Sequence, residues 1–254
     1  MLTPRWILLT VLVAVAVAVM VRLGFWQLAR LSDRRASNAQ MMARQGQEPL
    51  DAGSLDHLRA DQAQVPESIW REVRVTGTYR SEDQVLVQRS NNGAPGFWVV
   101  TPLLTQEGVA VAVNRGWVPI TVGDGGDPRT YSAPAGEVTV TGLVQAPEQE
   151  RAVQEAGPGG ARLSVLSRVD LGRMSGQVPY ALVPIWVLMG EQQPAQDGPL
   201  PMLVLPPPPD DGPHLNYAGQ WFIFATLTVV VFPMAVRRAA RSRQAQGTVD
   251  GRNT

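Results

Sequence analysis

The side chains with the clearest chemical potential lie at the start of the second apolar run of the sequence. If a helix begins at His214, then His214, Tyr217 and Trp221 fall at positions i, i+3 and i+7, which share one face. A neutral imidazole can be an axial ligand of haem iron, and the two aromatic rings could flank a flat macrocycle. The alternative is a plain membrane interface, where Tyr and Trp gather in any case.

A second compact polar cluster is the segment Asn114-Arg115-Gly116-Trp117. The planar guanidinium of Arg115 could pair bidentately with a carboxylate, including a haem propionate. A salt bridge inside an acidic domain is the alternative. We expect Gly116 to form a tight turn after the strand that precedes it.

The residue inventory excludes several other chemistries. The chain has no Cys and no Lys, and its two His are His57 and His214. Disulfides, thiolate metal sites, iron–sulfur clusters, covalent CxxCH haem attachment and Schiff-base lysines are therefore excluded. No GxSxG, HExxH or P-loop motif occurs, and His57 lies in a polar stretch that we expect at the surface. We expect a protein that is not an enzyme, with its cofactor site at His214.

Two uncharged apolar runs flank the chain's middle part. The first spans Trp6 to Val21 and the second spans Ala218 to Val236. Both approach the length of about 20 residues that a membrane-spanning helix needs. A cleaved signal peptide is the rival interpretation of the first run, but the run is long and bulky Leu23-Gly24-Phe25-Trp26 stands where a small-residue cleavage site should be.

The formal charge of zero conceals a segregation along the chain. Residues 1–35 carry +4, residues 36–236 carry −8, and residues 237–254 carry +4. A balanced total argues against a nucleic-acid binder. Arginines after the second run, with Asp210 and Asp211 before it, predict that both termini are cytoplasmic and that the middle part lies outside the cell membrane. The first run disagrees locally, because Arg22, Arg30, Arg34 and Arg35 follow it and only Arg5 precedes it.

The middle part has the alternation of strands. Expected strands are 70–79, 84–89, 97–104, 108–113, 137–144 and 184–189; residues 27–45 and 166–176 are expected helices, and 122–136 and 146–161 are expected loops. The predicted fold class is a membrane α+β protein in which two transmembrane helices flank an extracytoplasmic, mainly antiparallel β domain with a few short helices. The predicted parts are an N-terminal transmembrane helix (1–26), the strand-rich domain (27–193), a Pro-rich connector (194–213), a second transmembrane helix (214–236) and a basic cytoplasmic tail (237–254).

Five segments in this order resemble the Surfeit locus protein 1 family of cytochrome c oxidase assembly factors. They are Gly24-Phe25-Trp26-Gln27-Leu28-Ala29-Arg30, Val75-Thr76-Gly77-Thr78-Tyr79, Pro95-Gly96-Phe97-Trp98-Val99-Val100-Thr101-Pro102-Leu103, Val113-Asn114-Arg115-Gly116-Trp117-Val118-Pro119 and His214-Leu215-Asn216-Tyr217-Ala218-Gly219-Gln220-Trp221-Phe222. All 22 basic residues are Arg, and there is no acid-poor transit peptide. Both features indicate a bacterial member of the family.

The resemblance implies an assembly factor that binds haem a transiently and without a covalent bond, and aids its insertion into oxidase subunit I. It implies His214 as the iron ligand, and we expect Tyr217 and Trp221 to flank the macrocycle and Arg115 to contact a propionate or the oxidase. Expected partners are subunit I, other oxidase subunits and the lipid bilayer, with haem a synthase and a respiratory supercomplex as further candidates, and no nucleic acid. Two alternatives stay open: a non-haem scaffold or accessory subunit that docks on the oxidase or on a respiratory supercomplex, and a membrane-tethered hydrolase.

Overall fold

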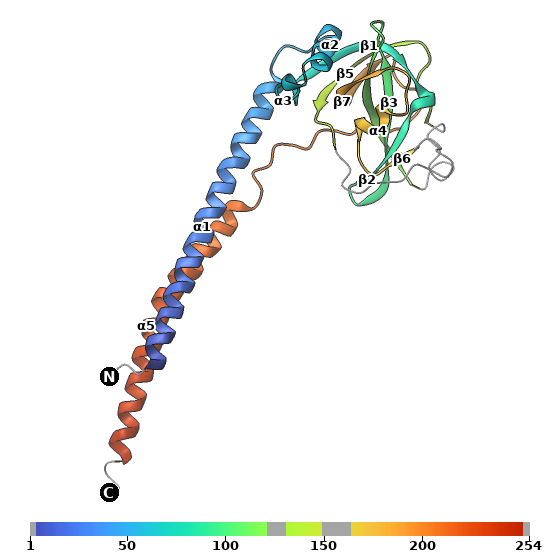
Figure 1. Cartoon of the computed structure of the whole chain (residues 1–254). Coiled ribbons are helices and arrows are strands. Elements are labelled where there is room, and N and C mark those ends of the chain that lie inside the picture. Colours follow the sequence, from blue (N-terminus) through green and yellow to red (C-terminus); the bar gives the residue numbers. More distant parts are fainter. Residues whose placement is uncertain (1–3, 121–130, 149–163, 251–254) are drawn as a thin grey trace. The chain divides into compact units, whose positions relative to one another are not determined.

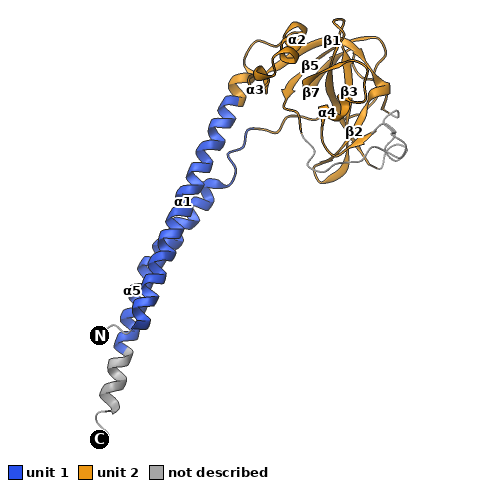
Figure 2. Ribbon diagram, in the orientation of Figure 1, with its two compact units in different colours: residues 1–40, 209–254 blue, residues 41–208 orange. Residues whose placement is uncertain are grey.

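The chain begins and ends in long helices and carries its strands between them (Figure 1). The computed structural model describes residues 4–120, 131–148 and 164–250, with the side chains of 242–250 left out. Contacts divide the chain into two compact units, a helical unit of residues 1–40 and 209–254 and a strand unit of residues 41–208 (Figure 2). Most of the loop predicted over 122–136 and of that over 146–161 lies outside the described residues.

The helical unit is built from helix α5 (His214–Asp250) and most of helix α1 (Pro4–Gln45), whose residues 41–45 belong to the strand unit. Both contain a stretch that is long and apolar enough to cross a membrane. Helix α5 begins at His214, which confirms the helix start predicted there. Helix α1 continues without a break through residues 27–45, which confirms the predicted extension of the first apolar run. The predicted membrane boundaries at residues 26 and 236 stay predictions.

The two helices run antiparallel (Figure 1), and small residues lie where they meet. The ring of Phe222 occupies the space beside Gly24, where a Cβ would lie 2.7 Å from the ring carbons. Ala218 and Ala225 of α5 are buried, while most large apolar side chains of both helices are exposed. Close packing at small residues with outward apolar surface is typical of helix pairs in a bilayer.

Charged side chains gather where residues 34–38 of α1 lie beside the residues that precede α5. Arg35 Nε lies 2.8 Å from Asp211 Oδ2. Arg34 Nε and Asn38 Nδ2 both donate to the carbonyl of Asp210, at 3.2 Å and 3.1 Å. Two of the arginines that follow the first apolar run thus meet the residues Asp210 and Asp211 that precede the second, Arg35 at a carboxylate and Arg34 at a backbone carbonyl. This pairing supplies a physical reason for the local excess of Arg on the predicted outer side of the first run.

The described residues of the strand unit form seven strands and a few short helices. The strands are β1 (Glu72–Tyr79), β2 (Val85–Asn91), β3 (Ala94–Leu104), β4 (Val109–Pro119), β5 (Glu137–Gln145), β6 (Val165–Leu166) and β7 (Ala181–Gln193). The helices are α2 (Ala52–Ala60), α3 (Val65–Ser68) and α4 (Leu171–Ser175), with 3-10 turns η1 (Gln62–Gln64) and η2 (Ser81–Asp83). Helix α2 leaves His57 exposed, as predicted.

The seven strands form one mixed sheet in the order β1-β5-β7-β4-β3-β2-β6. The pairs β4–β7 and β2–β6 are parallel and the others are antiparallel, so the predicted mainly antiparallel domain contains two parallel pairs. An additional pairing of β1 with β3, through Thr78 with Leu104 and Tyr79 with Leu103, closes five strands into a ring. Gly77 permits this closure, because a Cβ there would lie 2.4 Å from the carbonyl oxygen of Leu104.

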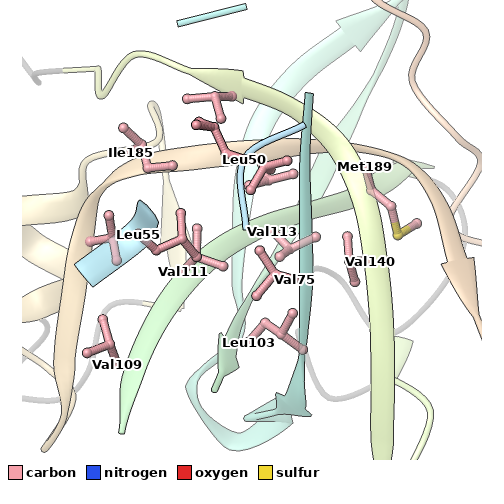
Figure 3. Packing of buried hydrophobic residues seen from close by; sticks show 14 of the residues in the cluster. Leu50, Leu55, Val75, Leu103, Val109, Val111, Val113, Val140, Ile185 and Met189 are labelled. Carbon is pink, nitrogen blue, oxygen red and sulfur yellow. The ribbon is translucent and has the colours of Figure 1, made fainter. Parts of the chain in front are cut away.

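Alternating side chains explain why these segments form strands around a core. Every second residue of β1 and β5 is buried, and the buried residues point into the ring. Val75, Leu103, Val111, Val140 and Ile185 come from five strands and meet there (Figure 3). Strand β4 is buried at ten successive positions, because its opposite face is covered by a second cluster that contains Leu166, Val169, and Leu171 and Met174 of α4.

The short helix α4 and the connector after β7 complete the strand unit. The Asp170 side chain accepts from the backbone N–H of Arg173, which caps α4, and Gly176 follows its last turn. The helix predicted over 166–176 is thus shorter, because β6 takes Val165 and Leu166. The Pro-rich connector is held at Met202, whose backbone exchanges hydrogen bonds of 2.8 Å and 2.7 Å with Trp117.

Candidate functional site

His214 is the first residue of α5 and faces α1. Its Nδ1 lies 2.9 Å from Oε1 of Gln27 in α1, and its side chain is half-buried. The first turn of α5 is set by the residues ahead of it, since the N–H of Tyr217 donates to the carbonyl of Pro213. One ring nitrogen of His214 is thus fixed by the partner helix.

The other ring nitrogen, Nε2, lies beside Gly212. Gly212 has a φ of +70°, and a Cβ built on it would lie 3.4 Å from Nε2 and 3.3 Å from Cδ2. Its N–H donates to Asp210 Oδ1 at 3.0 Å, which fixes the turn. Within the described part of the chain, Nε2 has no hydrogen-bond partner. Glycine therefore leaves room next to an imidazole nitrogen that is available to an incoming ligand.

The two aromatic residues predicted beside His214 lie on the following turns of the same helix. Tyr217 is 47% exposed, and Trp221 is half-buried with its ring edge-on to Phe224 at a centroid distance of 6.3 Å. The structure thus places His214, Tyr217 and Trp221 together on α5. Their contact with a macrocycle stays a prediction.

The donor set fits a haem better than a bare metal ion. Among the described residues, no three His, Cys, Asp or Glu side chains gather in a way that could hold a metal ion. A porphyrin supplies four equatorial nitrogens itself, so a protein needs to add only one or two axial donors. His214, with Nε2 open and exposed aromatic surface on the next turn of its helix, matches that requirement.

Arg115 occupies a different environment, inside the strand unit. The expectation that Gly116 forms a turn after the strand is wrong: β4 continues through residues 114–119, and the register with β3 shifts between Val99 and Val100. Arg115 is the extra residue of this β-bulge, which aims its side chain inward. Gly116 follows with a φ of +142°, and a Cβ there would lie 2.4 Å from the carbonyl oxygen of Met202.

The guanidinium of Arg115 is fully buried and surrounded by acceptors. Nη1 donates to Gln84 Oε1 at 3.0 Å and to the carbonyl of Tyr131 at 2.7 Å. Nη2 donates to the carbonyl of Ser132 at 3.1 Å and to Gln196 Oε1 at 2.6 Å. The cation also lies over the Tyr79 ring, 5.4 Å from its centre. These acceptors are amide and carbonyl oxygens, not the carboxylate expected of a salt bridge.

Burial shifts the pKa values of Arg115 and Tyr79 in this cluster, in opposite directions. Desolvation lowers the pKa of the Arg115 guanidinium, and the neighbouring Tyr79 opposes the shift. Burial likewise raises the pKa of Tyr79, with Arg115 opposing. Arginine retains its proton even in such sites because its ordinary pKa exceeds 12. Arg115 therefore fastens β4 to the segments that supply its acceptors. The predicted contact of Arg115 with a propionate or the oxidase stays a prediction.

Sequence reasoning missed two residues of the His214 site, Gln27 and Gly212. Gln27 lies within a motif quoted for its resemblance, but only the pairing of α1 with α5 shows which residue it meets. The available signal was a polar side chain directly after the apolar segment Leu23-Gly24-Phe25-Trp26. Gly212 gave no signal in the sequence, because it lies in a Pro-rich connector, where glycine is common.

Comparison with known proteins agrees with the resemblance stated above. Residues 14–226 match the SURF1 family. A SURF1-like protein of Mycobacterium tuberculosis is 28% identical over 250 residues, which cover 96% of this chain and 89% of that protein. A SURF1-like protein of Rickettsia felis is 24% identical over 229 residues, which cover 87% of this chain and 93% of that protein. The chain therefore belongs to the SURF1 family, which is tied to cytochrome oxidase assembly.

Proposed function

We propose that this protein binds haem a through His214 and aids its insertion into subunit I of cytochrome c oxidase. The observation that carries the proposal is the state of His214: Nδ1 is occupied by Gln27, and Nε2 lies open beside Gly212. Haem a is here the cargo, and its iron supplies the coordination position that Nε2 fills. The protein's own part is to hold and orient the imidazole, not to catalyse a reaction.

Delivery requires that the cargo is released as well as bound. A single imidazole, with no Cys in the chain for covalent attachment, suits a reversible complex. Tyr217 and Trp221 would add contact area on the helix face that carries His214. Subunit I and other oxidase subunits are the proposed recipients, with haem a synthase or a supercomplex component as the proposed donor side.

We further propose that both termini are cytoplasmic and that the strand unit lies outside the cell membrane. Arg237, Arg238 and Arg241 follow the apolar part of α5, as the positive-inside rule requires. The chain has no Cys, so single cysteines can report sidedness. In intact cells a membrane-impermeant maleimide should label Ser90→Cys, on an exposed strand position, and should not label Arg241→Cys. The reverse labelling pattern would refute this orientation.

The proposed ligand is tested by purifying the protein from cells that make haem a and recording its absorption spectrum. The tag must lack histidine, because the chain has only His57 and His214. We expect the haem absorbance to be lost in His214→Ala. His57→Ala is the matched control, since it removes the other, exposed imidazole, and should retain the absorbance. A haem spectrum that is unchanged in His214→Ala would rule out His214 as the ligand.

A scaffold that docks on the oxidase without touching haem is the second candidate. The charge of −8 over residues 36–236 favours it, since an acidic surface could bind a partner of opposite charge. The haem carrier and the scaffold predict different outcomes in cells that carry the His214→Ala variant. A haem carrier predicts an oxidase that lacks haem a, whereas a scaffold predicts normal haem content and undiminished co-purification with the oxidase.

A further inference from the structure

Gln27 makes the one polar side-chain contact to the imidazole of His214 that the described residues provide. The Nδ1–Oε1 distance of 2.9 Å is that of a well-formed hydrogen bond. The contact joins the two ends of the sequence, since Gln27 belongs to α1 and His214 to α5. Gln27 is half-buried. The function proposed above uses this contact to show that Nδ1 is occupied, and it does not say what Gln27 does to the imidazole.

The chemistry of the two groups fixes where the proton of the imidazole lies. A neutral imidazole has one nitrogen that donates and one that accepts. The carboxamide oxygen of Gln27 can only accept, so the bond to Oε1 places the proton on Nδ1. The lone pair is then on Nε2, the nitrogen beside Gly212. An imidazole that ligates a metal through one nitrogen usually donates its other N–H to a protein acceptor in this way.

We propose that Gln27 is a positioning residue that holds His214 in the Nδ1–H tautomer, so that Nε2 is the nitrogen presented to haem iron. The assignment of a role toward iron rests on the proposed function; the tautomer itself does not. Gly212 completes the arrangement, because its missing side chain keeps the approach to Nε2 open. The first helix thus prepares a ligand that the second helix carries.

An amide suits this task better than the carboxylate that often holds a metal-binding histidine. A carboxylate acceptor makes the imidazole a more basic and tighter ligand, and it would add a negative charge next to the apolar segments of the two helices. Glutamine fixes the tautomer without that charge. A carrier that must release its cargo gains from the weaker ligand, so Gln27→Glu should retain the tautomer and bind haem more tightly.

The tautomer is tested without haem. Full-length protein in detergent micelles is labelled with ¹⁵N-histidine in a His57→Gln background, so that His214 gives the only imidazole signals. In alkaline buffer, which keeps the ring neutral, nitrogen NMR should show Nδ1 protonated. Gln27→Leu should shift the ring toward the Nε2–H tautomer, and Gln27→Glu should restore Nδ1–H. The matched control is Gln40→Leu, an exposed glutamine on the same helix, which should leave the wild-type pattern. A proton on Nε2 in the wild type, or no change in Gln27→Leu, would overturn the proposal.

A haem titration then separates this proposal from the function on which it rests. With iron protoporphyrin IX as the probe, Gln27→Leu should weaken binding about 10- to 100-fold, the usual cost of losing such a partner, and Gln27→Glu should not. Equal affinity of the wild type and Gln27→Leu would overturn the role toward iron. If His214→Ala binds the probe as well as the wild type, the proposed function fails, while the NMR result still decides the tautomer.

Discussion

Arg115 and His214 are polar residues of two sequence motifs, and they differ in burial and in the number of hydrogen-bond partners that the protein supplies. Arg115 is fully buried in the strand unit, and its guanidinium meets four oxygen acceptors and an aromatic ring. His214 is half-buried in the helical unit, where the protein occupies one of its ring nitrogens. Most of the hydrogen-bond donors of Arg115 have partners inside the protein, whereas one ring nitrogen of His214 has no hydrogen-bond partner among the described residues.

The difference shows what distinguishes a structural polar residue from one that can bind a ligand. A buried charge must find its partners within the protein, or the folded state loses several kcal/mol. A ligand-binding group instead needs an open donor or acceptor and a fixed orientation. By that criterion, Arg115 maintains the strand unit, whereas His214 keeps one oriented ring nitrogen open to a ligand. The comparison predicts opposite effects of mutation on stability and on haem binding.

The largest expected effect is that of Arg115→Leu. The substitution removes four hydrogen bonds and a cation–π contact from a buried position. We expect a loss of about 3 kcal/mol or more in unfolding free energy. For a domain of this size that is a fall of roughly 6–12 °C in Tm, measured by tryptophan fluorescence of the full-length protein in detergent.

Two variants make that measurement decisive. Arg74→Leu removes an exposed arginine from β1 and should change Tm little. His214→Ala should lose haem binding while its Tm stays within a few degrees of wild type. An Arg115→Leu protein as stable as Arg74→Leu would contradict the structural role of Arg115. A large fall in Tm in His214→Ala would mean that His214, like Arg115, is needed for stability.

The next effect concerns the glycine that follows Arg115. Gly116 and Gly136 both have a positive φ, but only Gly116 has a backbone atom within 4 Å of the position of a Cβ. Gly136→Ala should therefore cost about 1 kcal/mol from backbone strain alone. Gly116→Ala adds a clash with Met202 in the connector and should cost about 2–3 kcal/mol.

Hydrogen exchange read by mass spectrometry distinguishes the two glycine variants beyond their Tm values. Gly116→Ala should speed exchange in peptides that contain Trp117 and Met202, whose backbones are paired. Gly136→Ala should leave those peptides protected. Equal exchange of both variants at these peptides would mean that the connector does not depend on the close approach at Gly116.

Local sequence pattern predicted much of this molecule, and long-range pairing decided the rest. Alternation predicted β1 and β5, and an apolar run led by His214 predicted the start of α5. The same local reasoning expected a turn at Gly116, because Gly is the usual turn residue. The bulge there depends on the pairing of β4 with β3 and with Met202, which are distant in sequence. The acceptor of His214 was hidden for the same reason, since Gln27 lies at the other end of the chain.

The smallest predicted effect is a pH dependence that arises at the edge of the Arg115 cluster. Tyr79 donates from its hydroxyl to Gln192 Oε1 at 3.0 Å, and burial raises its pKa above the ordinary value near 10. Because the folded protein binds the phenolic proton more tightly than the unfolded chain does, the neutral phenol contributes its full stability below about pH 10 and loses it as the pH rises further. Tyr79→Phe removes the hydrogen bond, so it should be about 1 kcal/mol less stable than wild type at pH 8.

Above pH 10 the order of the two proteins should change. The wild type loses about 1.4 kcal/mol per pH unit as the unfolded phenol ionises, and Tyr79→Phe has no such group to lose. The gap in Tm between them should therefore close near pH 10.5 and reverse by about pH 11. Tyr180, whose pKa is raised by burial and by its hydrogen bond to Asp83, is present in both proteins and cancels in the comparison. A gap that stays constant from pH 8 to pH 11 would show that the Tyr79 hydroxyl is as accessible in the folded protein as in the unfolded chain. It would then place the edge of the Arg115 cluster in contact with solvent.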